Sequence, residues 1–162
     1  MDRLDEALAD LSRAIEFHPA YEWAISTRGE TYRQLGRYGQ ALADLNRAIE
    51  LIPDDDWTLH ARGETYRQLE RYDEALADLD RAIELDPASD WAISARGQTY
   101  LAFGCYDEAL AGLDRAIELD PSDAEAIFNR GKTRRLLGRE AEALADFNRA
   151  IELDPSRQPG EG

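Results

Sequence analysis

The sequence predicts an all-α protein built as an α-solenoid of antiparallel helix-turn-helix hairpins. Three observations support this prediction. The sequence repeats itself with a period of 34 residues. Within each period, apolar residues recur at helical spacing in two separate stretches. A proline also recurs near the end of each period, where it ends the second helix because the residue before a proline is disfavoured in the helical conformation.

The repeat divides the chain into a leading segment, four blocks and a tail. The first and second blocks share 22 of 34 positions, and the second and third also share 22 of 34. The fourth block is more diverged but keeps the frame. The leading segment aligns only with the second half of a block, so we expect it to be the second helix of an incomplete repeat. The boundaries are, in chain order, 1–21, 22–55, 56–89, 90–123, 124–157 and 158–162.

The second block illustrates the expected hairpin. A first apolar stripe runs from Trp57 to Leu69, a turn follows around Glu70 and Arg71, and a second stripe runs from Ala75 to Leu85. Asp86-Pro87 ends the second helix. The other blocks repeat this order, so the sequence predicts one hairpin per block.

Small residues and proline recur at four fixed block positions. They are Gly29, Gly63, Gly97 and Gly131 at position 8; Ala41, Ala75, Ala109 and Ala143 at position 20; Ala48, Ala82, Ala116 and Ala150 at position 27; and Pro53, Pro87, Pro121 and Pro155 at position 32. On these residues the chain resembles the tetratricopeptide repeat family, everywhere except the tail 158–162. The resemblance implies a right-handed superhelix, with the first helix of each hairpin lining a concave groove that holds a ligand.

An arginine stands at block position 7, where this family often has a large apolar residue. We expect each of these arginines to lay its methylenes on the hairpin and to pair with an acid of the second helix. The arginines are Arg28, Arg62, Arg96 and Arg130, and the acids proposed as partners are Asp44, Asp78 and Asp146.

Composition and charge exclude several classes of partner. The chain carries 19 basic and 34 acidic residues, a formal net charge of -15, which is opposite to what a phosphate backbone or an anionic membrane requires. A related hairpin repeat that binds RNA would need a basic groove. We therefore expect no nucleic-acid partner and no membrane association. The single cysteine, Cys105, and the absence of a signal-peptide pattern favour a cytoplasmic setting.

No residue pattern predicts catalysis, a metal or a cofactor. His18 and His60 occupy different block positions, and neither has a second histidine or a cysteine at ligand spacing. The run 54–56 lacks the alternating oxygen ligands of a calcium loop and is better interpreted as a helix cap and first turn. We expect the chain not to be an enzyme.

The family resemblance implies candidate groove residues on the first helices. The tryptophan row has two open interpretations, as ligand contacts or as seals between hairpins, and the two are compatible. The arginines at block position 12 are expected to face solvent. The candidates are Trp23, Trp57, Trp91, His60, Phe128, Glu30, Glu64, Arg33, Arg67 and Arg135.

The leading functional prediction is a non-enzymatic scaffold that holds a protein or peptide in the groove. The alternative is a structural or self-associating segment, for example the sensor arm of a larger bacterial signalling protein. Repeat arrays need polar caps, which this chain lacks, so we expect apolar ends that stack on another copy and form a homo-oligomer. The end residues are Leu4, Leu8, Leu11 and Ile15 at the start, and Leu144, Phe147 and Ile151 at the finish.

Overall fold

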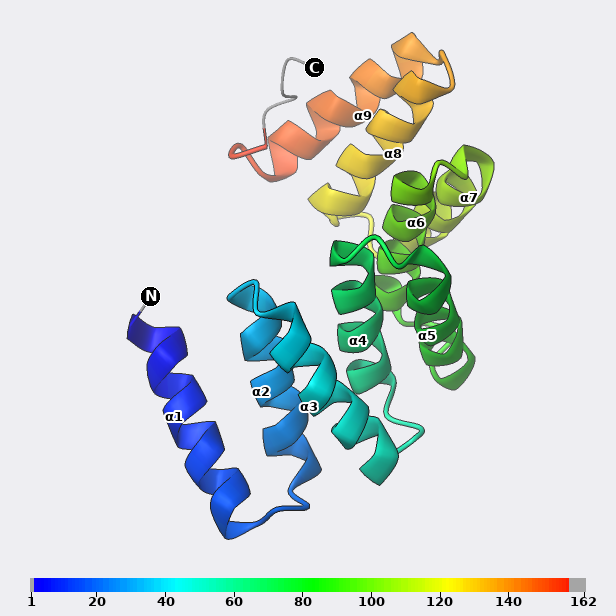
Figure 1. Cartoon of the computed structure of the whole chain (residues 1–162). Helices are drawn as coiled ribbons and strands as arrows, with labels where there is room; N and C mark the ends of the chain where they lie inside the picture. Colours follow the sequence, from blue (N-terminus) through cyan, green and yellow to red (C-terminus); the bar gives the residue numbers. More distant parts are fainter. Residues whose placement is uncertain (1, 158–162) are drawn as a thin grey trace. The chain divides into compact units, whose positions relative to one another are not determined.

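The computed structural model describes residues 2–157, and these residues form nine helices and no strand (Figure 1). The all-α prediction is confirmed. The tail 158–162 lies outside the described residues. The helices are α1 (Asp2–Phe17), α2 (Glu22–Gln34), α3 (Tyr38–Leu51), α4 (Asp56–Gln68), α5 (Tyr72–Leu85), α6 (Asp90–Phe103), α7 (Tyr106–Leu119), α8 (Ala124–Leu136) and α9 (Glu140–Leu153).

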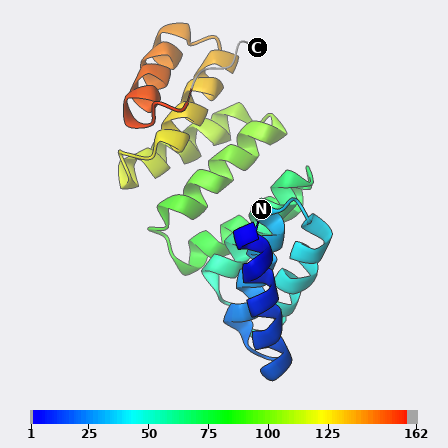
Figure 2. The same cartoon turned by 90° about the vertical axis from the view of Figure 1, so that its left-hand side faces the viewer.

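The chain divides into two compact units, Met1–Asp86 and Pro87–Gly162. In unit 1, α1 lies beside α2, and the hairpins α2–α3 and α4–α5 pack in sequence (Figures 1 and 2). In unit 2, the hairpins α6–α7 and α8–α9 pack in the same way. Each unit is thus a short solenoid of helical hairpins.

Each hairpin turns through a residue in the left-handed conformation at block position 15. In three hairpins this residue is a glycine with φ between 69° and 86°, for example Gly36. In the second hairpin it is Glu70, with φ of 58°. A residue with a Cβ is strained in this conformation, so the second turn carries a local cost that the other three do not.

The helices of a hairpin approach closely because block position 8 has no side chain. A Cβ built on Gly29 would lie 2.8 Å from Leu45 Cγ, and one built on Gly63 would lie 3.0 Å from Leu79 Cγ. The facing alanines Ala41 and Ala75 are fully buried. The sequence-based interpretation of these small residues as packing sites is confirmed.

Three of the four position-7 arginines pair with acids of the second helix, as predicted. Arg28 donates to both carboxylate oxygens of Asp44, at 2.7 and 2.8 Å, and Arg62 does the same to Asp78, at 2.7 Å for each bond. Arg130 donates to Asp146 at 3.0 and 2.7 Å. The third hairpin has glycine at the position of these acids, so the forked pair cannot form there.

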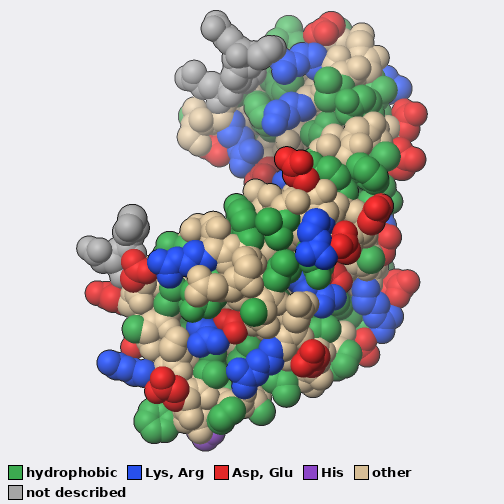
Figure 3. All heavy atoms as spheres, viewed as in Figure 1, with side chains coloured by type: hydrophobic (Ala, Val, Ile, Leu, Met, Phe, Trp, Pro, Cys, Tyr) green, Lys and Arg blue, Asp and Glu red, His purple; other side chains and the backbone are tan. Residues whose placement is uncertain are grey.

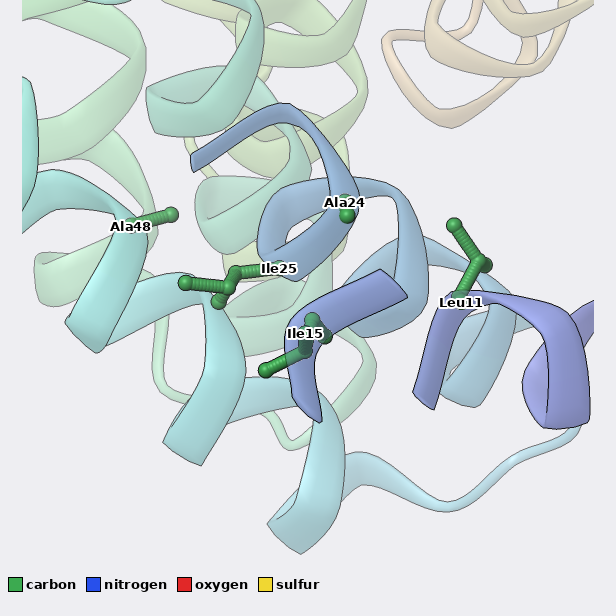
Figure 4. Packing of buried hydrophobic residues seen from close by; sticks show 5 residues of the cluster. All are labelled: Leu11, Ile15, Ala24, Ile25 and Ala48. Atoms are coloured by element: carbon green, nitrogen blue, oxygen red, sulfur yellow. The ribbon is translucent and has the colours of Figure 1, made fainter. Parts of the chain in front are cut away.

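The apolar stripe of α1 is buried, which corrects the expectation of an exposed leading end. Leu11 and Ile15 pack with Ala24 and Ile25 of α2 and with Ala48 of α3 (Figure 4). The physical reason is that α1 has a single apolar face, and α2 covers it.

The same correction holds for Leu8, which is 7% exposed. At the other end, Phe147 is 6% exposed because its ring packs on Gly131 and Phe128. Of the predicted end residues, Leu144 is largely exposed, at 61%, while Leu4 and Ile151 are partly buried.

The first helices of the four hairpins, α2, α4, α6 and α8, start with a shared side-chain capping pattern that only α2 lacks. Asp55 accepts a hydrogen bond from the Thr58 backbone N–H, and Ser89 and Asp123 cap α6 and α8 in the same way. Tyr21 occupies this position before α2 and provides no side-chain cap. Among the helices of residues 2–157, none combines the length and apolarity that crossing a membrane requires.

Candidate binding surface

Seven of the predicted groove residues lie on the first helices of unit 1, α2 and α4. They recur at spacings of three, four and seven residues, which places them on one face of each helix. The two helices are joined where Thr58 Oγ1 of α4 donates to Glu22 Oε1 of α2, at 3.2 Å. We call this surface the unit-1 face; it comprises Trp23, Glu30 and Arg33 of α2, and Trp57, His60, Glu64 and Arg67 of α4.

The two tryptophans of the unit-1 face are exposed. Trp23 is 58% and Trp57 is 40% accessible to solvent. Both line one pocket of about 240 Å³ at the N-terminal ends of α2 and α4. Both indoles therefore keep a large part of their surface accessible to solvent. The remaining lining residues of this aromatic pocket are Glu22, Ser26, Thr27 and Asp55.

Beyond the pocket, the unit-1 face carries two glutamate–arginine pairs. Arg33 donates to both carboxylate oxygens of Glu30, at 2.7 and 2.6 Å, and Arg67 donates to both of Glu64, at 2.9 and 2.6 Å. The arginine side chains are only 23% and 20% exposed. These two arginines are therefore partly buried rather than solvent-facing, because a glutamate one turn earlier holds each guanidinium against the helix. Arg135, the third arginine at this block position, is exposed as expected.

His60 lies among these charges. Its imidazole has a pKa lowered chiefly by burial, with Glu64 and Glu30 opposing the shift and Arg33 and Arg67 adding to it. Burial would raise the pKa of Glu64, but the hydrogen bonds and charge of Arg67 lower it overall. Two carboxylates and two guanidinium groups thus surround an imidazole whose neutral form is favoured by burial.

Unit 2 holds the other three predicted residues, Trp91, Phe128 and Arg135. Trp91 is half-buried on α6. On α8, the Phe128 ring lies 5.3 Å from that of Phe147, and the Arg135 guanidinium lies 5.6 Å from the Phe147 ring centre.

A second pocket, of about 250 Å³, lies in unit 2 and includes Arg135. Its other lining residues are Lys132, Leu101 and Leu136. Lys132 stands at block position 9, where the first two hairpins have Glu30 and Glu64. This pocket is therefore basic and apolar, whereas the unit-1 face carries equal numbers of acidic and basic side chains.

Sequence reasoning missed the polar lining of the aromatic pocket. Glu22 and Asp55 stand at block positions 1 and 34, at opposite ends of one block, and only the stacking of two hairpins brings them together. Tyr21 was also missed, although it breaks the capping pattern of Asp55, Ser89 and Asp123. Its ring lies 5.8 Å from that of Trp23, so it extends the aromatic surface.

Within residues 2–157, no group of three or more His, Cys, Asp or Glu side chains is arranged to hold a metal ion. On the face that Figure 3 presents, acidic and basic side chains are interspersed with hydrophobic ones. The arrangement suits contact with a mixed polar and apolar chain more than capture of a small charged ligand.

Two family models described as tetratricopeptide repeat match residues 21–88 and 94–157. Together they cover most of the chain and include every residue of the unit-1 face. Among proteins with curated descriptions, none gives a significant match.

Solved structures of tetratricopeptide repeat proteins are similar over nearly the whole chain. YrrB, described as having an unusual peptide-binding site, is 27% identical, with a TM-score of 0.74 over 96% of this chain and 80% of that one. A thermophilic protein of this family from Thermus thermophilus, TTC0263, is 26% identical, with a TM-score of 0.83 over 95% and 84%. The pilus biogenesis factor PilW, at 24% identity and a TM-score of 0.88 over 96% and 72%, shows likeness of fold.

Proposed function

Because this chain belongs to the tetratricopeptide repeat family, we propose that it is a non-enzymatic scaffold that binds a protein or peptide on its unit-1 face. The observation that carries this proposal is the pair of exposed tryptophans, Trp23 and Trp57, that line one pocket. Exposed indoles cost solvation free energy unless a partner covers them, and tryptophan is enriched where binding energy concentrates.

The polar part of the unit-1 face supports a peptide rather than a small molecule. The paired side chains of Glu30, Arg33, Glu64 and Arg67 are held rigidly by forked hydrogen bonds. Fixed donors and acceptors lose little conformational entropy when a ligand binds. An extended peptide lying along α2 and α4 would meet aromatic surface at one end and alternating charges beyond it.

A selection from a random-peptide display library tests this proposal. The wild-type protein is expected to enrich peptides, and the Trp23→Ala/Trp57→Ala variant is expected to lose their binding by at least about tenfold. The matched control is Leu51→Ala/Leu144→Ala, which removes two exposed apolar side chains elsewhere and is expected to bind like wild type. Equal binding by the tryptophan variant and wild type would refute the proposal.

A second candidate is self-association. Its support is the exposed side chain of Leu144 on α9, since the stripe of α1 is already covered by α2. Light scattering across a concentration series, with Leu144→Glu as the comparison, tests it. A wild-type protein that stays monomeric at the highest concentration would contradict this candidate.

A further inference from the structure

The aromatic pocket combines two indole walls with two carboxylates. Trp23 and Trp57 supply the walls, Glu22 and Asp55 supply the carboxylates, and Ser26 and Thr27 complete the lining. The faces of indole rings carry negative electrostatic potential and attract cations. The indole walls and the two carboxylates therefore both favour a positively charged ligand group.

The two carboxylates keep capacity for a ligand. Oδ2 of Asp55 accepts from the Thr58 backbone N–H at 2.8 Å, and Oε1 of Glu22 accepts from Thr58 Oγ1 at 3.2 Å. Each carboxylate has a second oxygen, with lone pairs beyond those used here. Within residues 2–157, these hydrogen bonds with Thr58 are the side-chain contacts of the two acids, and neither acid forms an ion pair there. Two carboxylates beside two indoles thus have hydrogen bonds but no ion-pair partner within residues 2–157.

In the last hairpin, an arginine of this chain stands at a block position that lines the aromatic pocket in the first hairpin. Arg157 occupies the same block position as Asp55, and its Nη2 donates to Glu125 Oε2 of α8 at 3.3 Å. Glu125 stands at the block position of Trp23. In the last described hairpin, the guanidinium of Arg157 therefore lies beside the start of α8.

We propose that the aromatic pocket receives a lysine or arginine side chain of the bound peptide, so that the partner is a basic segment. This inference rests on the proposed function and names the class of ligand for it. The net charge of -15 supports it, because a strongly acidic protein attracts cationic segments and raises their rate of encounter.

The test uses peptides selected from the display library and the full chain. Binding is measured for each selected peptide and for versions in which single Lys or Arg residues are replaced by Gln or norleucine. The protein variant is Glu22→Gln/Asp55→Asn, which removes both charges, keeps an acceptor for Thr58 and retains a good N-cap residue. The matched control is Glu50→Gln/Asp54→Asn, which removes the same charge from exposed positions outside the pocket.

We expect one basic residue of the peptide to be essential. Its replacement and the Glu22→Gln/Asp55→Asn change should each weaken binding by roughly tenfold, and together they should weaken it little further. The control variant should lose much less affinity. Peptides that require the tryptophans but no basic residue would overturn this inference and leave the proposed function standing. A library that yields no binding peptide would overturn both.

Discussion

The guanidinium of Arg62 on α4 forms two hydrogen bonds with the carboxylate of Asp78 on α5, at 2.7 Å each. Its remaining Nη1 donates to Asn46 Oδ1 of α3 at 2.8 Å. Arg28 repeats this arrangement with Asp44 and Ser12, and Arg130 with Asp146 and Asp114. Each of these arginines joins the two helices of its own hairpin to the helix that precedes this hairpin, α1, α3 or α7. Polar contacts therefore stabilise the stacking of hairpins together with the small residues.

Arg62→Ala is expected to lower the free energy of unfolding by about 2 kcal/mol, because the carboxylate of Asp78, only 9% exposed, loses its partner. Urea denaturation followed by circular dichroism measures the change. Arg81→Ala, whose exposed guanidinium pairs with Asp54 and Glu84, is the control and should change stability little. Equal effects of the two substitutions would show that the forked pair does not stabilise the hairpin stack.

Gly29→Ala is expected to destabilise unit 1 by about 1–3 kcal/mol. The new Cβ would lie 2.8 Å from Leu45 Cγ and 3.3 Å from the Ala41 carbonyl oxygen. Gly39→Ala is the control: nothing lies within 4 Å of its added Cβ, so it should stabilise α3 by up to about 1 kcal/mol through helix propensity. Thermal melts of both variants measure these opposite signs, and a gain in stability for Gly29→Ala would contradict the close approach of α2 and α3.

Glu70→Gly is expected to stabilise the second hairpin by about 1 kcal/mol. Glu70 has φ of 58°, a conformation that its three counterparts adopt as glycine, and relief of this strain outweighs the added freedom of the unfolded chain. Equilibrium unfolding measures the gain. The opposite change at an equivalent turn, Gly36→Glu, should cost a similar amount. No gain at Glu70 together with a loss at Gly36 would show that the Glu70 side chain compensates its own strain.

The free energy of unfolding is expected to fall as the pH drops from about 7.5 to about 5.5. Burial lowers the pKa of His60 in the folded state, so in this range the unfolded chain binds a proton more readily than the folded chain does. The destabilising effect of His60 is absent at a pH above the pKa of the unfolded-state imidazole. It grows as the pH falls toward the lower pKa that this imidazole has in the folded state. Denaturant titrations across this range for wild type and His60→Ser measure the slope.

His60→Ser is expected to flatten this dependence, and the serine matches Ser26 and Ser94 at the same block position. His18→Ser, at an exposed site, is the control. If the free energy of unfolding depends on pH as strongly in His60→Ser as in wild type, a group other than His60 causes this dependence.

The sequence predicted most of the fold because its signals are local and repeated. Gly29, Ala41, Ala48 and Pro53 recur in each block, so period and hairpin follow from spacing alone. The pairing of Arg62 with Asp78 was also predictable, since charges on facing helices of a hairpin have few other partners.

What could not be predicted depends on the direction in which each helix face points. Leu11 and Ile15 read equally well as an exposed end or a buried stripe until α2 is placed against them. The aromatic pocket was not predictable because Glu22 and Asp55 come from opposite ends of one block, and the stacking of α2 and α4 determines their approach. The partial burial of Arg33 likewise depends on which rotamer reaches Glu30.

Chemical-shift mapping of the ¹⁵N-labelled full chain, titrated with a library-selected peptide, tests most directly whether the unit-1 face binds the ligand. We predict that the largest changes occur at the indole N–H signals of Trp23 and Trp57 and at the backbone amides of α2 and α4. Changes confined to α7 or α9, with both indole signals unmoved, would contradict the assignment of the unit-1 face as the binding surface.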